Sequence, residues 1–325
     1  MIFNTKIIDF ILNDLNGDAL CFRETPFHDM DTNLRKANLT YEYTQKEIEN
    51  IVDVESDIIK FSKYCLKNVI LRDYQKMYMQ ELYNNNKIIC LQARQVGSTL
   101  SSSIFLLKLL MEGKKILIIS SRRDSSMELI SKIKTLYINL PFYMKPGIES
   151  LNQSSIRFDN GGTIRHSSNV IPIAHTFDCI FINGAAHIPQ NTLSNIINSC
   201  VLINTKFILE SSPNGNNYFY DIWTNANLEV GDLNKNPFKP IRLDYWLVPG
   251  RDEKWKQQTI KEIGSTAFEQ EYELKFAVKT NKESEKVIIP SGDDRVNLLE
   301  HQIKILNDKI CKFETIIVNL RNDNL

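Results

Sequence analysis

The sequence predicts an α/β protein in which helices cover a mostly parallel β-sheet. From Val69 onward, short apolar runs alternate with longer stretches of helical periodicity, the pattern of strands and helices that follow one another along a chain. The apolar runs indicate buried strands. With 325 residues, the chain is long enough for one large domain with appendages or for two domains.

Four segments are predicted to be core strands, and helices separate them. The strands are expected at 87–91, 115–120, 179–183 and 206–210, with helices at 99–112 and 126–138. The turn Asp159-Asn160-Gly161-Gly162 predicts a hairpin between 155–158 and 163–166. Further helices are expected at 253–263 and 266–276, with Ser265 as the N-cap of the second.

The ends of the chain differ in composition from this α/β domain, which we place at 69–279. Residues 1–68 predict a helical N-terminal subdomain, because apolar residues recur there at helical spacing. The residues concerned are Ile7, Ile8, Ile11, Leu12, Ile48, Ile51, Ile58 and Ile59. Residues 280–295 are polar and predict a linker, and 296–325 predict a helix.

The C-terminal helix carries an unbroken heptad pattern over four repeats. Its seam positions are Val296, Leu299, Ile303, Leu306, Ile310, Phe313, Ile317 and Leu320. β-Branched residues at every a position, with Leu or Phe at every d position, favour a parallel two-stranded coiled coil. The alternative is a helix that folds back on its own domain, since Leu298 and Ile305 widen the apolar face. We expect self-association or binding to a partner helix.

Composition excludes several classes of protein. Lys and Arg balance Asp and Glu at 39 each, so any contact with DNA needs a local basic patch. The six cysteines lack C-x-x-C spacing and indicate buried free thiols, and the five histidines lack the spacing of metal ligands. Asp9 and Asp14 interrupt the apolar N-terminus, so we expect no signal peptide, no membrane span and an intracellular protein.

The strand at 88–91 leads into the outline of a phosphate-binding loop. Such a loop carries Gly-Lys-Ser/Thr, but this chain has Gly97-Ser98-Thr99, with serine in the place of the lysine. The strand at 179–182 should end in Asp-Glu and instead ends in Asn183-Gly184. These features predict a P-loop NTPase fold of the RecA/ASCE type that lacks its reactive side chains.

Each missing group has a task in such an ATPase. The lysine neutralises charge on the β- and γ-phosphates, the aspartate helps to hold Mg²⁺, and the glutamate orients the attacking water. Ser98 is short and uncharged, Asn183 adds no negative charge, and Gly184 has no side chain. We therefore expect no catalytic residue, negligible hydrolysis, weak binding of ATP and little use of Mg²⁺.

Several further segments complete the pattern. They are Leu71-Arg72-Asp73-Tyr74-Gln75, Ala93–Thr99 with Arg94 and Gln95 before the glycine, Ser211-Ser212-Pro213-Asn214-Gly215, 248–255 and 268–273. Together with Asn183-Gly184, and in this order, they make residues 69–278 similar to the ATPase domain of the large terminase subunit, the genome-packaging motor of tailed phages.

The resemblance implies roles for particular residues. It implies nucleotide binding by Tyr74, Gln75, Arg94, Gln95, Gly97, Ser98 and Thr99. It also implies that Ser212, Pro213, Asn214 and Gly215 form the motif that couples hydrolysis to DNA movement, and that Arg122 and Arg123 are candidate DNA contacts. Two departures stand out: Ile173-Ala174 replaces the family's Arg-Gly pair, and no nuclease is recognisable after Lys279. DNA cleavage is not expected from this chain.

Three functional hypotheses follow. The first is an inactive terminase-type module with a structural or regulatory role in virion assembly, beside the portal or an active terminase. The second is an active packaging ATPase in which Arg94 replaces the lysine. The third is an oligomeric scaffold or adaptor that acts through its coiled coil. All three place the protein in the host cytoplasm or the virion.

Overall fold

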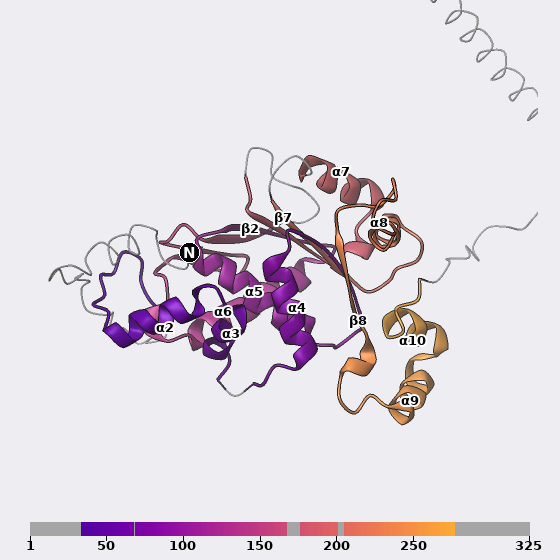
Figure 1. The fold of residues 1–325 in the computed structure, drawn as a ribbon, viewed down its shortest axis with the longest axis horizontal. Helices are drawn as coiled ribbons and strands as arrows, with labels where there is room; N and C mark the ends of the chain where they lie inside the picture. The colour runs from indigo at the N-terminus through magenta and orange to yellow at the C-terminus, as the bar shows by residue number, and fades with distance from the viewer. Residues whose placement is uncertain (1–33, 68, 168–175, 201–204, 277–325) are drawn as a thin grey trace, which may run out of the picture. The chain divides into compact units, whose positions relative to one another are not determined.

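A mixed eight-stranded sheet organises the residues that the computed structural model describes, which are 34–67, 69–167, 176–200 and 205–276 (Figure 1). The strands are β1 (Lys87–Gln92), β2 (Lys115–Ser120), β3 (Ile148–Asn152), β4 (Ser155–Phe158), β5 (Thr163–Ser167), β6 (Cys179–Asn183), β7 (Lys206–Ser211) and β8 (Lys239–Leu243). Their order is β3-β4-β5-β2-β6-β7-β1-β8, and the six strands from β5 to β8 pair in parallel. β3, β4 and β5 are antiparallel and contain the expected hairpin.

Helices cover both faces of this sheet. In Figure 1, α3, α4, α5 and α6 lie on one side, and α7 and α8 lie on the other. The long helices are α2 (Gln45–Glu55), α3 (Ile58–Cys65), α4 (Asp73–Asn84), α5 (Ser98–Met111), α6 (Arg123–Asn139), α7 (Gln190–Cys200), α8 (Tyr218–Ala226), α9 (Glu253–Ile263) and α10 (Ser265–Glu271). Short 3₁₀ turns lie at Phe142–Met144, Ala185–His187 and Tyr245–Leu247. In the described ranges, no helix has the length and hydropathy needed to cross a bilayer.

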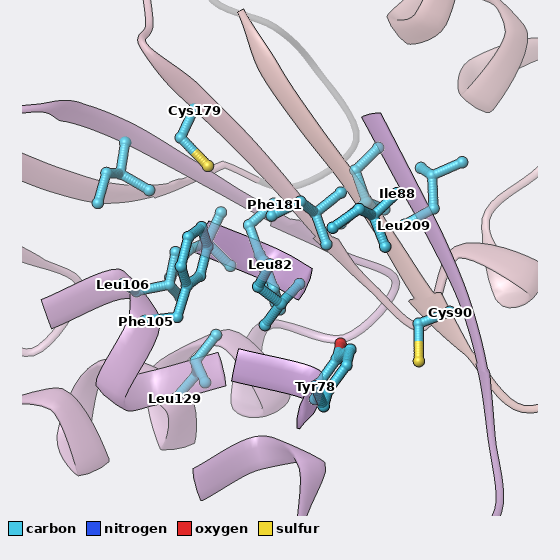
Figure 2. Close-up of a cluster of buried hydrophobic side chains, with 14 of the residues drawn as sticks. Tyr78, Leu82, Ile88, Cys90, Phe105, Leu106, Leu129, Cys179, Phe181 and Leu209 are labelled. Carbon is cyan, nitrogen blue, oxygen red and sulfur yellow. The ribbon is translucent and has the colours of Figure 1, made fainter. Parts of the chain in front are cut away.

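Helix α5 is the centre of the core. It packs between α4, α6 and the sheet, and nearly all of its side chains are buried. Figure 2 shows Phe105 and Leu106 of α5 beside Leu129 of α6, facing the strand residues above them. A helix with apolar residues on every side is expected in such a position. Each aliphatic or aromatic side chain buried here contributes about 1.5–3 kcal/mol, so the core fixes the start of α5 firmly against the sheet.

The described N-terminal helices share this core. Ile58 and Phe61 of α3 are buried, and α3 packs on α4 and α5. The fully buried Lys108 of α5 donates to the carbonyl of Val54 at 3.0 Å, which ties the end of α2 to α5. The predicted helix around Ile7, the pair Ile173-Ala174, the linker and the heptad helix lie outside the described residues.

Most predicted elements are confirmed, and two details are wrong. The four core strands and the helices at 99–112 and 126–138 agree with β1, β2, β6, β7, α5 and α6 to within three residues. The last helix ends at Glu271 and does not reach residue 276, because Leu274 adopts a left-handed φ of 60°. Ser265 is the first helical residue, and Gly264 occupies the cap position. Cys65, Cys90 and Cys179 are buried free thiols, as expected.

Candidate functional site

A polar cavity of about 660 Å³ lies at the carboxyl ends of the parallel strands. The ends of β1, β2, β6 and β7 contribute Gln92, Ser121, Asn183 and Ser211 to its lining. Ligands of open α/β sheets bind in this position, outside the carboxyl ends of the strands. Arg94, Gln95, Ser98 and Thr99 bring the predicted phosphate loop to the same cavity.

The phosphate loop has the backbone that anion binding requires. Gly97 has a left-handed φ of 77°, and Gln95 has a φ of 57°. A Cβ at Gly97 would lie 2.5 Å from Nε2 of Gln75, so a larger residue would have to displace this side chain as well as adopt a left-handed φ. Ser98 then begins α5, which places the positive end of the helix dipole at the cavity.

Side chains behind the loop hold its four carbonyl groups. Arg251 donates to the carbonyl oxygens of Arg94 (2.9 Å) and Gln95 (3.1 Å). The hydroxyl of Tyr74 donates to Val96 O at 2.7 Å, and the amide of Gln75 donates to Gly97 O at 3.2 Å. Tyr74 and Gln75 therefore support the loop in this structure, and their implied contact with an adenine stays a prediction.

These contacts also orient the amides. In a trans peptide the N–H of a residue points away from the carbonyl of the residue before it. Because the four carbonyls bond to Arg251, Tyr74 and Gln75, the N–H groups of residues 95–98 point away from those three side chains. Of these four residues, Gln95 and Ser98 line the cavity. Backbone amides at a helix start are the groups that attract anions in phosphate-binding loops.

The end of β6 keeps the position of the family's acidic pair but not its chemistry. Asn183 and Gly184 both line the cavity. Gly184 has a left-handed φ of 71°, and its N–H donates to Glu210 O at 2.8 Å. The nearest atom to an added Cβ is Oγ of Ser121 at 3.6 Å, so there is room for a side chain. The backbone, however, disfavours any L-residue here by about 1–2 kcal/mol.

The segment at 211–215, for which the resemblance implies a coupling role, connects the turn after β6 with α10. Ser211 accepts from the N–H of Ala186 at 3.1 Å, and Asn214 donates to Ala186 O at 3.0 Å. The carbonyl of Pro213 accepts from Gln270 of α10 at 2.9 Å. Ser212 lines the cavity, and Gly215 has a φ of 72°. The motif therefore touches the strand-end turn, the cavity and the last described helix.

Glu210 is a fully buried carboxyl group close to the site. It lies on β7 opposite Asn183 and accepts hydrogen bonds from Tyr78 and Ser102. Burial raises the pKa of Glu210, and the hydrogen bonds from Ser102 and Tyr78 oppose that rise. Figure 2 shows the Tyr78 ring below Cys90 of β1, within the core. Glu210 is buried among these side chains and is not among the residues that line the cavity.

The structure adds residues that the sequence did not point to. His187 and Glu271 line the cavity, and so do Ser121 and Ser125. Ser121 directly follows β2, so the strand-end rule could have found it. Arg122 also lines the cavity, whereas Arg123 begins α6. Of the described lining residues, Arg94 and Arg122 are basic and Glu271 is acidic.

Comparisons with known proteins agree with this geometry. A family model described as "Terminase large subunit, T4likevirus-type, N-terminal" matches residues 89–288. The large terminase ATPase domain of Thermus phage P74-26 is similar at 20% identity and a TM-score of 0.51, covering 61% of this chain and 92% of that one. The large terminase of bacteriophage HK97 is 13% identical with a TM-score of 0.51, covering 68% of this chain and 55% of that one. This chain thus matches about half the length of the HK97 protein.

Proposed function

Because the chain belongs to the T4-like family of terminase large subunits, we propose that it is a nucleotide-binding module that has lost hydrolysis and has a structural or regulatory role in virion assembly. One contrast within the site supports this proposal. The backbone cradle of the phosphate loop is intact, while Ser98, Asn183 and Gly184 stand where the lysine and the acidic pair would act.

An ATPase assay tests the loss of hydrolysis. We expect purified protein to release no phosphate from Mg·ATP above a buffer blank, with or without DNA, because three groups of the reaction are absent together. A turnover of about one per second would contradict the proposal.

The same assay judges the alternative of an active ATPase. Arg94 lines the cavity and is exposed, so its guanidinium is the group that could stand in for the lysine. If hydrolysis is present and Arg94→Ala abolishes it, the active alternative is correct. Arg123→Ala, which changes a basic residue that does not line the cavity, is the matched control.

Nucleotide binding is proposed to be weak and largely independent of Mg²⁺. The backbone amides of the loop attract phosphate without any side chain, but the strand end offers no carboxylate to the metal. We expect dissociation constants for ATP and ADP in the range of roughly 0.1 to a few mM, about 3.5–5.5 kcal/mol of binding free energy. Calorimetry with and without Mg²⁺ measures them.

Assembly is proposed to depend on the predicted coiled coil at 296–320. Eight apolar seam positions, at about 25 cal/mol per Å² of buried apolar surface, could offset the entropy of association. Light scattering should find a dimer or larger species that becomes monomeric when Ile303 and Ile310 are both changed to Asp. A monomeric native chain would favour a helix that folds back. The portal, an active terminase and a second copy of this chain are the candidate partners.

A further inference from the structure

We infer that Arg251 is a positioning residue of the phosphate loop, which holds the peptide units at 94–96 so that their N–H groups face the cavity. The inference rests on the proposed nucleotide binding and identifies what maintains that site in the absence of the lysine. Arg251 does not line the cavity and acts only through the loop backbone.

The contact is bidentate. Nη1 of Arg251 lies 2.9 Å from Arg94 O, and Nη2 lies 3.1 Å from Gln95 O. A planar guanidinium can bond two neighbouring carbonyls at once with fixed geometry, whereas a lysine ammonium is a single point of attachment. The contact therefore sets the orientation of two successive peptide planes.

The loop needs this support at Gln95. A non-glycine residue with a φ of 57° is in a sparsely populated conformation that persists when surrounding contacts enforce it. Arg251 bonds the carbonyl of Gln95 itself and that of the preceding residue. Without these bonds, the peptide units are free to rotate toward ordinary φ values and turn their amides away from the cavity.

Arg251 is itself held in place. Its guanidinium lies 4.8 Å from the ring centroid of Trp255 and 5.6 Å from that of Tyr272. Tyr245 and Phe268 complete a cluster of aromatic rings with these two residues. The N–H of Arg94 donates to Glu271 O at 2.9 Å, so a second contact joins the loop to the end of α10. These contacts therefore restrict the position of the guanidinium that bonds the loop.

Binding measurements test the effect on the ligand site. The probes are ADP without Mg²⁺ and inorganic pyrophosphate, measured by calorimetry on the full chain and on a Ser98→Lys variant. We expect Arg251→Ala to weaken binding about tenfold in both, and Arg251→Lys to weaken it less. Millimolar guanidinium ion should restore part of the binding to Arg251→Ala. Unchanged affinity for Arg251→Ala would overturn the inference.

Arg242→Ala is the matched control. Arg242 of β8 donates to Glu273 O, after α10, at 3.0 Å and to the neighbouring Asp244 at 2.7 Å, and neither contact involves the loop. We expect its removal to leave binding unchanged. An equal loss of affinity in both variants would mean that general loosening of α9 and α10, and not the loop contact, is responsible, and would overturn the inference.

Trypsin provides a test that needs no ligand. Arg94 is exposed within the loop, so a loosened loop can be cleaved after it. We expect cleavage between Arg94 and Gln95, identified by fragment mass, to be about tenfold faster in Arg251→Ala than in the native chain or Arg242→Ala. Equal rates would overturn the inference. If neither the native chain nor Ser98→Lys binds the probes, the proposed function fails, while this cleavage still decides the role of Arg251.

Discussion

The phosphate loop and the end of β6 line one cavity but match the expected family pattern to different degrees. The loop keeps its shape, because Arg251, Tyr74 and Gln75 hold its carbonyls from behind. The end of β6 carries Asn183-Gly184 where the resemblance implies an acidic pair, and Gly184 has a left-handed φ that favours glycine. The shape of the loop depends on contacts with residues far away in the sequence. The chemistry expected at the end of β6 depends on two adjacent side chains. The two properties can therefore be lost separately.

The largest expected effect is on nucleotide affinity, and it should come from placing a positive charge in the phosphate loop. Ser98→Lys should tighten ATP and ADP binding by roughly 10–100-fold, because a charge-assisted hydrogen bond contributes about 1.5–3 kcal/mol. Calorimetry without Mg²⁺ measures the change. Ser98→Met, of similar length but uncharged, should not tighten binding. If lysine and methionine act alike, the loop no longer presents its ligand to position 98. Hydrolysis is expected only after Asn183→Asp and Gly184→Glu are added.

An intermediate effect, on the free energy of unfolding, should come from substitutions at the end of β6. Gly184→Glu should lower the free energy of unfolding by about 1–2 kcal/mol, because φ is left-handed at this position. Gly184→Ala should show much of the same loss, and Asn183→Asp should change stability by less than about 0.5 kcal/mol. Urea denaturation of the three variants gives these values. A Gly184→Glu variant as stable as the native chain would show that the left-handed φ at this position does not disfavour a side chain.

The smallest expected effect is on the pH dependence of stability, and it concerns the buried carboxyl group of Glu210. Burial raises the pKa of Glu210 above its ordinary value of 4.5. The folded state then binds a proton more tightly than the unfolded state, so the stabilising contribution is complete below pH 4.5 and is lost as the pH rises through the folded pKa. Relative to Glu210→Gln, the native chain should lose stability from about pH 4.5 upward. A difference that grows with acidity instead would reverse the sign of the shift.

The fold was largely predictable because its core strands are short apolar runs between turns. β1, β2, β6 and β7 all have this pattern, and each was located to within one residue. β8 was missed, since Lys239-Pro240-Ile241-Arg242-Leu243 mixes charge and proline with apolar residues. The overlong last helix reflects a property of tertiary structure: Leu274 is 2% exposed and takes a left-handed conformation that its residue type does not favour.

Site residues could be predicted only where a sequence motif directly follows a predicted strand. Ser98, Asn183 and Gly184 follow directly from the two strand ends, and the structure brings them to one cavity. The partners of the loop carbonyls could not be inferred in this way. Arg251 lies in a segment whose similarity to the family was visible, but its contact with Arg94 joins residues 157 positions apart. The spacing of residues in a sequence does not predict a contact over such a separation.

The backbone at Gly184 also bears on the history of this protein. A descendant that regained glutamate there would first lose about 1–2 kcal/mol, out of the roughly 5–15 kcal/mol by which a domain is stable. It would gain no turnover until lysine and aspartate had returned as well. The left-handed φ at Gly184 therefore makes glutamate alone a costly first step on any route to hydrolysis.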